Sequence, residues 1–98
     1  MPLRYPRAFV CMYTGDSLRY HRMMKFSTQD RDNDHEPTRH CAQIEKGGWW
    51  YNGCSKANLN GEALHGKTKE TSGIIWYTWK GYFYSLKHVR MMVKPYNA

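Results

Sequence analysis

Hydrophobic and polar residues alternate regularly only in the last part of the chain. In YFYSLKHVRMMVK, one parity is shared by Tyr82, Tyr84 and Leu86, and the other parity is shared by Val89, Met91 and Val93. Successive side chains of a strand point to opposite faces, so a change of parity requires an extra residue. The pattern therefore predicts one long strand from Tyr82 to Lys94 with a bulge or bend near Lys87.

The remaining segments are short and weakly periodic. Asp16 and Ser17 are typical N-cap residues and precede one or two predicted helical turns in DSLRYH. MMKFST, GGWWYNG and SGIIWYTW favour short extended segments, whereas residues 30–40 form a loop. Aromatic residues make up 15% of the chain, which indicates local side-chain clusters rather than a layered aliphatic core. We expect an α+β fold that is loop-rich, with short strands, few helical turns and one long C-terminal strand.

Length and charge narrow the possible classes of protein. The 98 residues suffice for one small domain, and the formal net charge is +7. Lys and Arg are scattered singly, which favours a solvated surface over a nucleic-acid or polyanion site. No segment reaches the roughly 18 apolar residues of a membrane span. The first 15 residues lack the apolar stretch of a signal peptide.

The three cysteines leave two interpretations open. Cys41 and Cys54 flank a segment rich in Gly and Trp, and a disulfide closing this loop would contribute roughly 3 kcal/mol. Cys11 would then stay free. Alternatively, these cysteines are reduced and buried in a cytosolic protein.

An acidic cluster is the most unusual feature of so basic a chain. Half of the eight acidic residues alternate with other residues in one short stretch: Asp30, Asp32, Asp34 and Glu36. Carboxylates at this spacing can converge on a hard cation such as calcium. An EF-hand is excluded, because His35 stands where Gly is needed and Cys41 where Glu is needed. The alternative is a solvated loop whose carboxylates pair with nearby arginines.

Other chemistry finds little support in the sequence. Adjacent His40 and Cys41 are poorly arranged for zinc, and the chain has no second C-x-x-C motif. Ser17 and His21 lie near one another without a nucleophile elbow, and no Gly-rich phosphate loop is present. We therefore predict that the chain is not an enzyme.

Three segments carry a family resemblance. GDSLRYHRMMKFSTQDRDND, CAQIEKGGWWYNGCSKANLNGEALHG and SGIIWYTWKGYFYSLKHVRMMVKP occur in order and resemble the end of a fibrinogen-related domain. This is the C-terminal globular domain of fibrinogen chains, ficolins, tachylectins, angiopoietins and tenascins. The resemblance runs from about Gly15 to Pro95 and covers somewhat over a third of that domain. It implies an unmatched segment over residues 1–14 and a fibrinogen C-terminal-like fragment over residues 15–98, with the calcium loop and the ligand-pocket subdomain.

The resemblance also implies a metal site and a disulfide. Asp32 and Asp34 match the carboxylate ligands of the family's calcium ion. Backbone carbonyls near Glu36 and Thr38 would complete the site. The family pairs the cysteines that match Cys41 and Cys54. It also has a cis peptide before the second of them, which here is the bond between Gly53 and Cys54.

A ligand pocket is implied beside this loop. It would be bounded by Glu45, Gly53, Cys54, Ser55 and Tyr82. In ficolin-like and tachylectin-like members the pocket holds acetyl groups of sugars, in a funnel of three tyrosines and a histidine. Here only Tyr82 matches, and Glu45 resembles an acidic residue that the fibrinogen γ chain uses against a basic peptide end. We expect a cationic ligand to be preferred over an acetylated sugar.

The family implies a secreted, extracellular recognition module that binds a carbohydrate, protein or peptide ligand and carries structural calcium. Oligomers could form through N-terminal regions absent from this chain. Two alternatives remain: a truncated structural fragment without independent activity, and weak binding of polyanions or nucleic acid by the basic surface.

Overall fold

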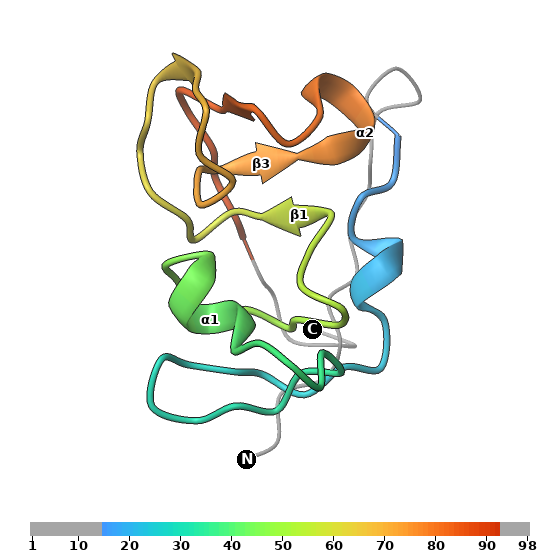
Figure 1. Ribbon diagram of the computed structural model, residues 1–98. Coiled ribbons are helices and arrows are strands. Elements are labelled where there is room, and N and C mark those ends of the chain that lie inside the picture. The colour runs from blue at the N-terminus through green and yellow to red at the C-terminus, as the bar shows by residue number, and fades with distance from the viewer. Residues whose placement is uncertain (1–14, 93–98) are drawn as a thin grey trace.

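The computed structural model describes residues 15–92, and the regular elements within them are short. They are, in chain order, η1 (Arg19–His21), α1 (Cys41–Ile44), β1 (Ala57–Asn58), β2 (Gly66–Lys67), β3 (Ile75–Trp76), α2 (Tyr77–Lys80) and β4 (Tyr84–Ser85). β1 pairs antiparallel with β3, and β2 pairs antiparallel with β4 (Figure 1). This loop-rich mixture of short strands and few helical turns confirms the predicted fold class.

The strand prediction for the C-terminal segment is wrong in its length. Within the described residues, strand structure there is limited to Tyr84–Ser85, and Val93 and Lys94 lie outside those residues. A strand persists only where a neighbouring chain accepts its backbone hydrogen bonds. β2 supplies a partner for two residues. Two further backbone bonds hold this segment: the N–H of Leu86 donates to the carbonyl of Ile74 at 2.7 Å, and the carbonyl of Phe83 accepts the N–H of Thr68 at 3.1 Å.

The helical turn near residue 19 forms where the sequence predicts it. Asp16 lies just before η1, and its Oδ1 atom accepts a hydrogen bond from the backbone N–H of Arg19 at 3.2 Å. Ser17 is buried and ties this turn to α2, because its Oγ atom accepts the backbone N–H of Thr78 at 3.0 Å. The first turn and the last helix are thus joined across most of the chain.

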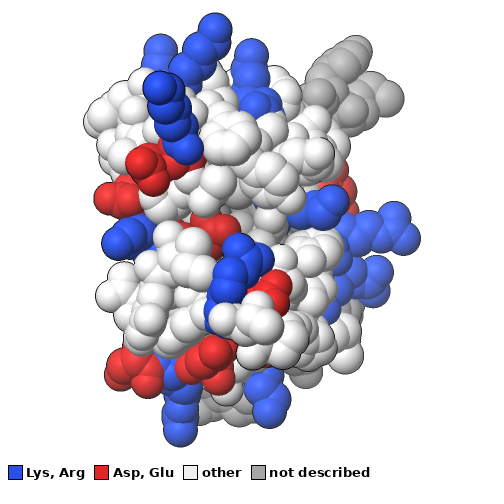
Figure 2. Space-filling model, in the orientation of Figure 1, with Lys and Arg blue, Asp and Glu red and all other residues white. Residues whose placement is uncertain are grey.

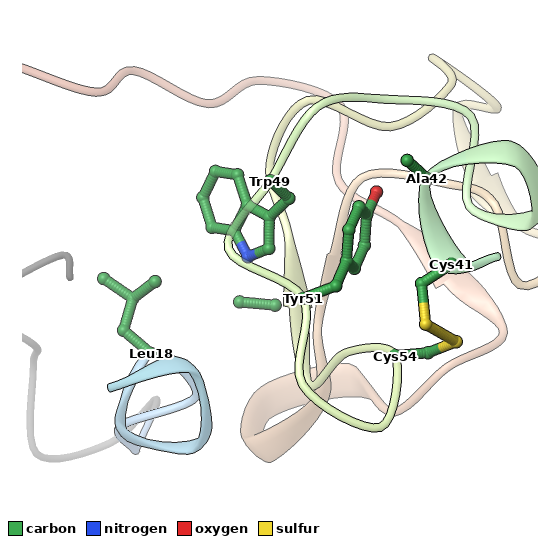
Figure 3. Packing of buried hydrophobic residues seen from close by; sticks show 7 residues of the cluster. Leu18, Cys41, Ala42, Trp49, Tyr51 and Cys54 are labelled. Carbon is green, nitrogen blue, oxygen red and sulfur yellow. A yellow bond between two sulfur atoms is a disulfide. The ribbon is translucent and has the colours of Figure 1, made fainter. Parts of the chain in front are cut away.

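The core is small and gathers around one disulfide. Its buried members are Leu18, Cys41, Ala42, Trp49, Tyr51, Cys54 and Ala57. Figure 3 shows the rings of Trp49 and Tyr51 between Leu18 on one side and the bridged cysteines on the other. The disulfide joins Cys41 to Cys54 with 5.0 Å between their Cα atoms, so the predicted pairing is confirmed. Its stabilisation of about 3 kcal/mol equals that of one or two buried core side chains.

Inside this core, the ring of His21 in η1 forms hydrogen bonds with the backbone at Trp50 and at the start of β1. Its Nδ1 atom donates to the carbonyl of Trp50 at 2.8 Å. Its Nε2 atom accepts the backbone N–H groups of Lys56 and Ala57, both at 3.1 Å. This arrangement requires a neutral ring, and burial lowers the pKa of His21 to about 4. The residue is therefore a structural histidine rather than a partner for catalysis.

The turn before the second cysteine differs from the expectation. Every peptide bond in residues 15–92 is trans, including the bond between Gly53 and Cys54. Cys54 instead adopts a left-handed backbone conformation, with φ at +61°. Its carbonyl accepts the backbone N–H of Asn52 at 3.0 Å. The reversal is achieved by this positive φ, so a cis bond is not needed to bring Cys54 to Cys41.

Candidate functional site: an acidic pocket beside a carboxylate loop

The acidic loop is ordered by hydrogen bonds from its own backbone. Oδ1 of Asp34 accepts the N–H of Glu36 and Oδ2 accepts the N–H of Cys41, both at 2.9 Å. Oδ1 of Asp32 accepts the N–H of Asp34 at 3.1 Å. Asp34 thereby joins the loop to the first residue of α1 and to the disulfide. These backbone dipoles offset part of the repulsion between the carboxylates.

Glu36 and Thr38 form a second small network in the same loop. The carboxylate of Glu36 accepts the Thr38 hydroxyl at 3.0 Å and pairs with Arg39 at 3.2 Å. The Thr38 hydroxyl and Arg39 lower the pKa of Glu36. The predicted pairing of this loop with a nearby arginine is thus present for Arg39. Both carboxylate oxygens of Glu36 take part in these contacts, and its predicted contribution to a metal site is its backbone carbonyl.

The donors of this loop suit a hard cation in chemical type. Asp32 and Asp34 offer carboxylate oxygens, and each oxygen can accept more than the single bond it makes here. No group of three or more His, Cys, Asp or Glu side chains that could hold a metal occurs among residues 15–92. Calcium also takes backbone carbonyls and water, so two carboxylates with two carbonyls form a suitable set. The oxygen donors of the four predicted metal residues are of the type that calcium takes, whereas structural zinc sites use mainly Cys and His, and the calcium site stays a prediction.

The five residues predicted for the ligand pocket come together in the structure. They share one cavity of about 180 Å³ with two others, and its lining is Arg39, Glu45, Gly53, Cys54, Ser55, Thr71 and Tyr82. Pockets for drug-sized ligands are usually at least about 300 Å³, so this one suits a single small group. An ammonium, a guanidinium or an acetyl group has that size.

Local structure explains how the pocket is assembled. Glu45 ends α1, where its N–H donates to the carbonyl of Cys41 at 2.7 Å. Its own carbonyl accepts the side-chain amide of Asn58 at 2.9 Å. The left-handed turn at Cys54 brings in the opposite wall, and Tyr82 enters just after α2. The disulfide thus fixes the two walls that carry Glu45 and Ser55.

Glu45 is the chemically distinctive group in this pocket. Its side chain is 7% exposed, and its Oε2 atom has no hydrogen-bond partner. Burial raises the pKa of Glu45 to about 7, and the charge of Arg39 and the nearby hydroxyl of Ser55 oppose that rise. Ser55 Oγ is also buried and makes no well-formed hydrogen bond. Glu45 Oε2 therefore stands unsatisfied in the cavity, which costs free energy until a ligand pairs with it.

The hydroxyl groups of the two tyrosines near Glu45, Tyr51 and Tyr82, have raised pKa values. Burial raises the pKa of Tyr51, and the charge of Glu45 raises it further. The pKa of Tyr82 is raised by burial and then by Tyr77, Tyr20 and Glu45. Both hydroxyls therefore stay neutral at physiological pH, so Arg39 and Glu45 supply the charge in the cavity.

Sequence reasoning did not assign Arg39 to the pocket. It was expected only as a counter-charge for the acidic loop, which it also is. Its position two residues before Cys41 could have indicated that the disulfide brings it to the pocket wall. Thr71 comes from a loop far along the chain that no local pattern marks, but the family resemblance places Glu70 or Thr71 at the position of one funnel tyrosine, and Thr71 lines the cavity.

The fold and the site define a small, disulfide-stabilised unit with a cavity for one small chemical group. The chain matches the family of fibrinogen beta and gamma chains, C-terminal globular domain, over residues 7–96, and it belongs to that family. Members of this family are structural and recognition proteins, and the chain is accordingly not an enzyme.

Individual relatives agree with the assignment. Tenascin-R of Gallus gallus is 49% identical over 84 residues, which are 86% of this chain and 6% of that protein. Angiopoietin-related protein 7 of Homo sapiens is 47% identical over 95 residues, which are 91% of this chain and 27% of that protein. The chain therefore spans only about a quarter or less of the length of these relatives. Such relatives are secreted extracellular proteins.

Solved structures show the same fold. The fibrinogen-like globe domain of human ANGPTL2 has a TM-score of 0.69 and 43% identity, over 76% of this chain and 35% of that one. Lamprey fibrin D-dimer, complexed with the peptide ligand Gly-His-Arg-Pro-amide, has a TM-score of 0.63 and 39% identity, over 71% of this chain and 24% of that one. One solved relative of this chain is thus a complex with a short peptide. No helix in the described part of this chain is long and apolar enough to cross a membrane.

Proposed function

We propose that this chain is the ligand-binding part of a secreted recognition domain, and that its pocket receives the cationic group of a peptide or protein. The observation that carries this proposal is Glu45, a buried carboxyl with an unpartnered oxygen in a cavity sized for one small group. The peptide bound to lamprey fibrin D-dimer contains an arginine, so a relative takes a ligand of this chemistry. A disulfide such as Cys41–Cys54 is also typical of secreted proteins.

A cation suits this pocket better than an acetyl group for a physical reason. A carboxyl raised to a pKa of about 7 is partly neutral at physiological pH, since burial penalises its charge. An ammonium or guanidinium offsets that penalty with a charge-assisted hydrogen bond. An acetyl methyl would instead leave the unpaired oxygen desolvated. Tyr82 alone cannot form the aromatic funnel that an acetyl group requires.

We also propose a calcium ion in the acidic loop, held by the carboxylates of Asp32 and Asp34 and by carbonyls of Glu36 and Thr38. The ion would supply charge neutralisation and no chemistry of its own. Asp34 already anchors α1 through the N–H of Cys41, and α1 leads directly to Glu45. Calcium would therefore stiffen the pocket rather than contact its ligand. Oligomers formed through regions outside this chain remain a prediction.

Polyanion binding is supported less well. Figure 2 shows basic side chains dispersed over the visible face, interspersed with acidic and uncharged ones. A nucleic-acid groove needs such charges aligned along a track.

Binding calorimetry with a matched pair of peptides tests the proposal. The probes are Gly-Ala-Ala-Ala-amide with a free amino terminus and the same peptide acetylated at that terminus. We expect the free amine to bind in calcium-containing buffer at pH 7.5 and the acetylated peptide to bind at least about tenfold more weakly. Glu45→Gln should remove this difference. Equal binding of both peptides, or stronger binding of N-acetylglucosamine, contradicts the proposal.

A further inference from the structure

Aromatic side chains next to Tyr82 extend the pocket wall beyond the cavity. The ring of Tyr82 stacks on that of Tyr77 with 4.4 Å between centroids. Lys56 Nζ lies 5.0 Å from the ring centroid of Tyr77 and 5.5 Å from that of Tyr20. The Tyr20 hydroxyl in turn donates to the carbonyl of Gly53 at 3.2 Å. Tyr20, Lys56 and Tyr77, here called the lysine shelf, therefore adjoin the pocket at both Tyr82 and Gly53.

The positive charge on this shelf is fixed in place but not neutralised. No ion pair involves Lys56 among residues 15–92. Its contacts with two rings hold its position and leave its full charge available. The pocket thus holds an unpaired carboxyl inside and an unpaired ammonium at its rim. A ligand complementary to both must carry a cation followed by an anion.

We propose that the lysine shelf is a second subsite, which binds an acidic side chain of the same peptide whose amino terminus enters the pocket. This inference rests on the proposed function of the pocket. An extended peptide rises about 3.3 Å per residue, and the shelf begins one stacked ring beyond Tyr82. The acidic residue therefore falls at the second to fourth position of the peptide. The exposed faces of Tyr77 and Tyr82 contact the chain between the two charged groups.

A second lysine provides a matched control. Lys80 Nζ lies 5.0 Å from the ring centroid of Trp79 and 5.5 Å from that of Tyr84, which nearly reproduces the contacts of Lys56. None of these three residues lines the pocket. Loss of Lys80 removes the same charge and the same kind of ring contact at a place where no ligand is expected.

The experiment compares peptides that differ only in one charge. Three tetrapeptide amides with a free amino terminus carry Asp at position two, three or four, with Gly and Ala elsewhere, and three counterparts carry Asn. In low salt at pH 7.5, we expect the best Asp peptide to bind about three- to fivefold tighter than its Asn counterpart. Lys56→Met should abolish that preference and Lys80→Met should retain it. Lys56→Glu should reverse it in favour of a Lys peptide.

The outcomes separate this subsite from the pocket itself. Equal binding of all Asp and Asn pairs, with the free amine still preferred over the acetylated terminus, overturns the shelf and leaves the pocket standing. An Asp preference that survives in Lys56→Met also overturns it. Absence of any peptide binding overturns both proposals. If Lys56→Met does not fold, the salt dependence of the wild-type protein tests the shelf instead. The preference for the Asp peptide over the Asn peptide must then nearly disappear at about 0.5 M salt, because salt screens the charge of Lys56.

Discussion

Mild acid should reveal two buried groups whose contributions to stability nearly cancel. His21 has a pKa of about 4 in the folded chain against its ordinary 6.5. Between these values the unfolded chain binds the proton more readily, so this contribution to stability is complete above pH 6.5 and is lost as the pH falls towards 4. At about 1.4 kcal/mol per pKa unit it amounts to about 3 kcal/mol, of which about 2.5 kcal/mol is lost by pH 4.5.

Glu45 acts in the opposite direction. Its folded pKa of about 7 lies above its ordinary 4.5, so the folded chain binds the proton more readily. The resulting stabilisation is complete below pH 4.5 and is lost as the pH rises through 7. Its size is also about 3 kcal/mol, because the difference between the two pKa values is similar. The wild-type chain should therefore change little in stability between pH 7.5 and 4.5.

Glu45→Gln removes the contribution of Glu45 to the pH dependence of stability and leaves that of His21. We expect urea unfolding, followed by tryptophan fluorescence, to show that the variant loses about 2.5 kcal/mol between pH 7.5 and 4.5. Asp30 and Glu36, whose pKa values are lowered, add to the loss in both proteins and leave the difference between the proteins intact. If the stability of this variant stays constant or rises as the pH falls, His21 is not a neutral ring held by three hydrogen bonds in the folded chain.

Further predictions concern single contacts, each measured by the same unfolding assay. Cys41→Ser should cost about 3 kcal/mol, and peptide mapping without reduction should recover the bridge only in the wild type. Asp34→Ala removes the acceptor of two backbone N–H groups and should cost about 2–3 kcal/mol in chelator, whereas Asp32→Ala should cost under about 1 kcal/mol. Both should abolish the heat of calcium binding, and an unchanged heat would refute the metal assignment. Gly61→Ala should destabilise by at least about 1–3 kcal/mol, because its Cβ would lie 2.3 Å from the carbonyl oxygen of Gly73; a neutral effect would contradict this packing.

Sequence patterns predicted the elements whose causes are local. The turn at η1 follows from Asp16, whose carboxylate accepts the N–H of Arg19, whereas Ser17 bonds to Thr78 instead, and the acidic loop follows from its own spacing. The family resemblance supplied the partner of Cys41 and the residues that now share one cavity. The geometry around Cys54 was missed, since a left-handed trans turn and a cis peptide can both reverse the chain. The long C-terminal strand was missed because strand length depends on a partner, and alternation within one segment says nothing about that partner.

The roles of His21 and Arg39 could not be read from sequence for a related reason. His21 is defined by backbone groups about 30 residues away, at Trp50, Lys56 and Ala57. Arg39 reaches the cavity because the disulfide turns α1 towards Cys54. Neither contact leaves a periodic or compositional trace. The neutral histidine and the unpaired Glu45 became visible only with burial and hydrogen-bond partners in hand.

The most direct test of the pocket is the titration of the Glu45 carboxyl by NMR, with carboxyl-labelled glutamate and with Glu45→Gln to assign the signal. We expect a pKa of about 7 for Glu45 in the free chain. Addition of the free-amine peptide Gly-Ala-Ala-Ala-amide should lower that pKa, because a bound ammonium favours the carboxylate. The acetylated peptide should leave it unchanged. An ordinary pKa in the free chain, or the same value with and without the free-amine peptide, would contradict the claim that Glu45 is the recognition group.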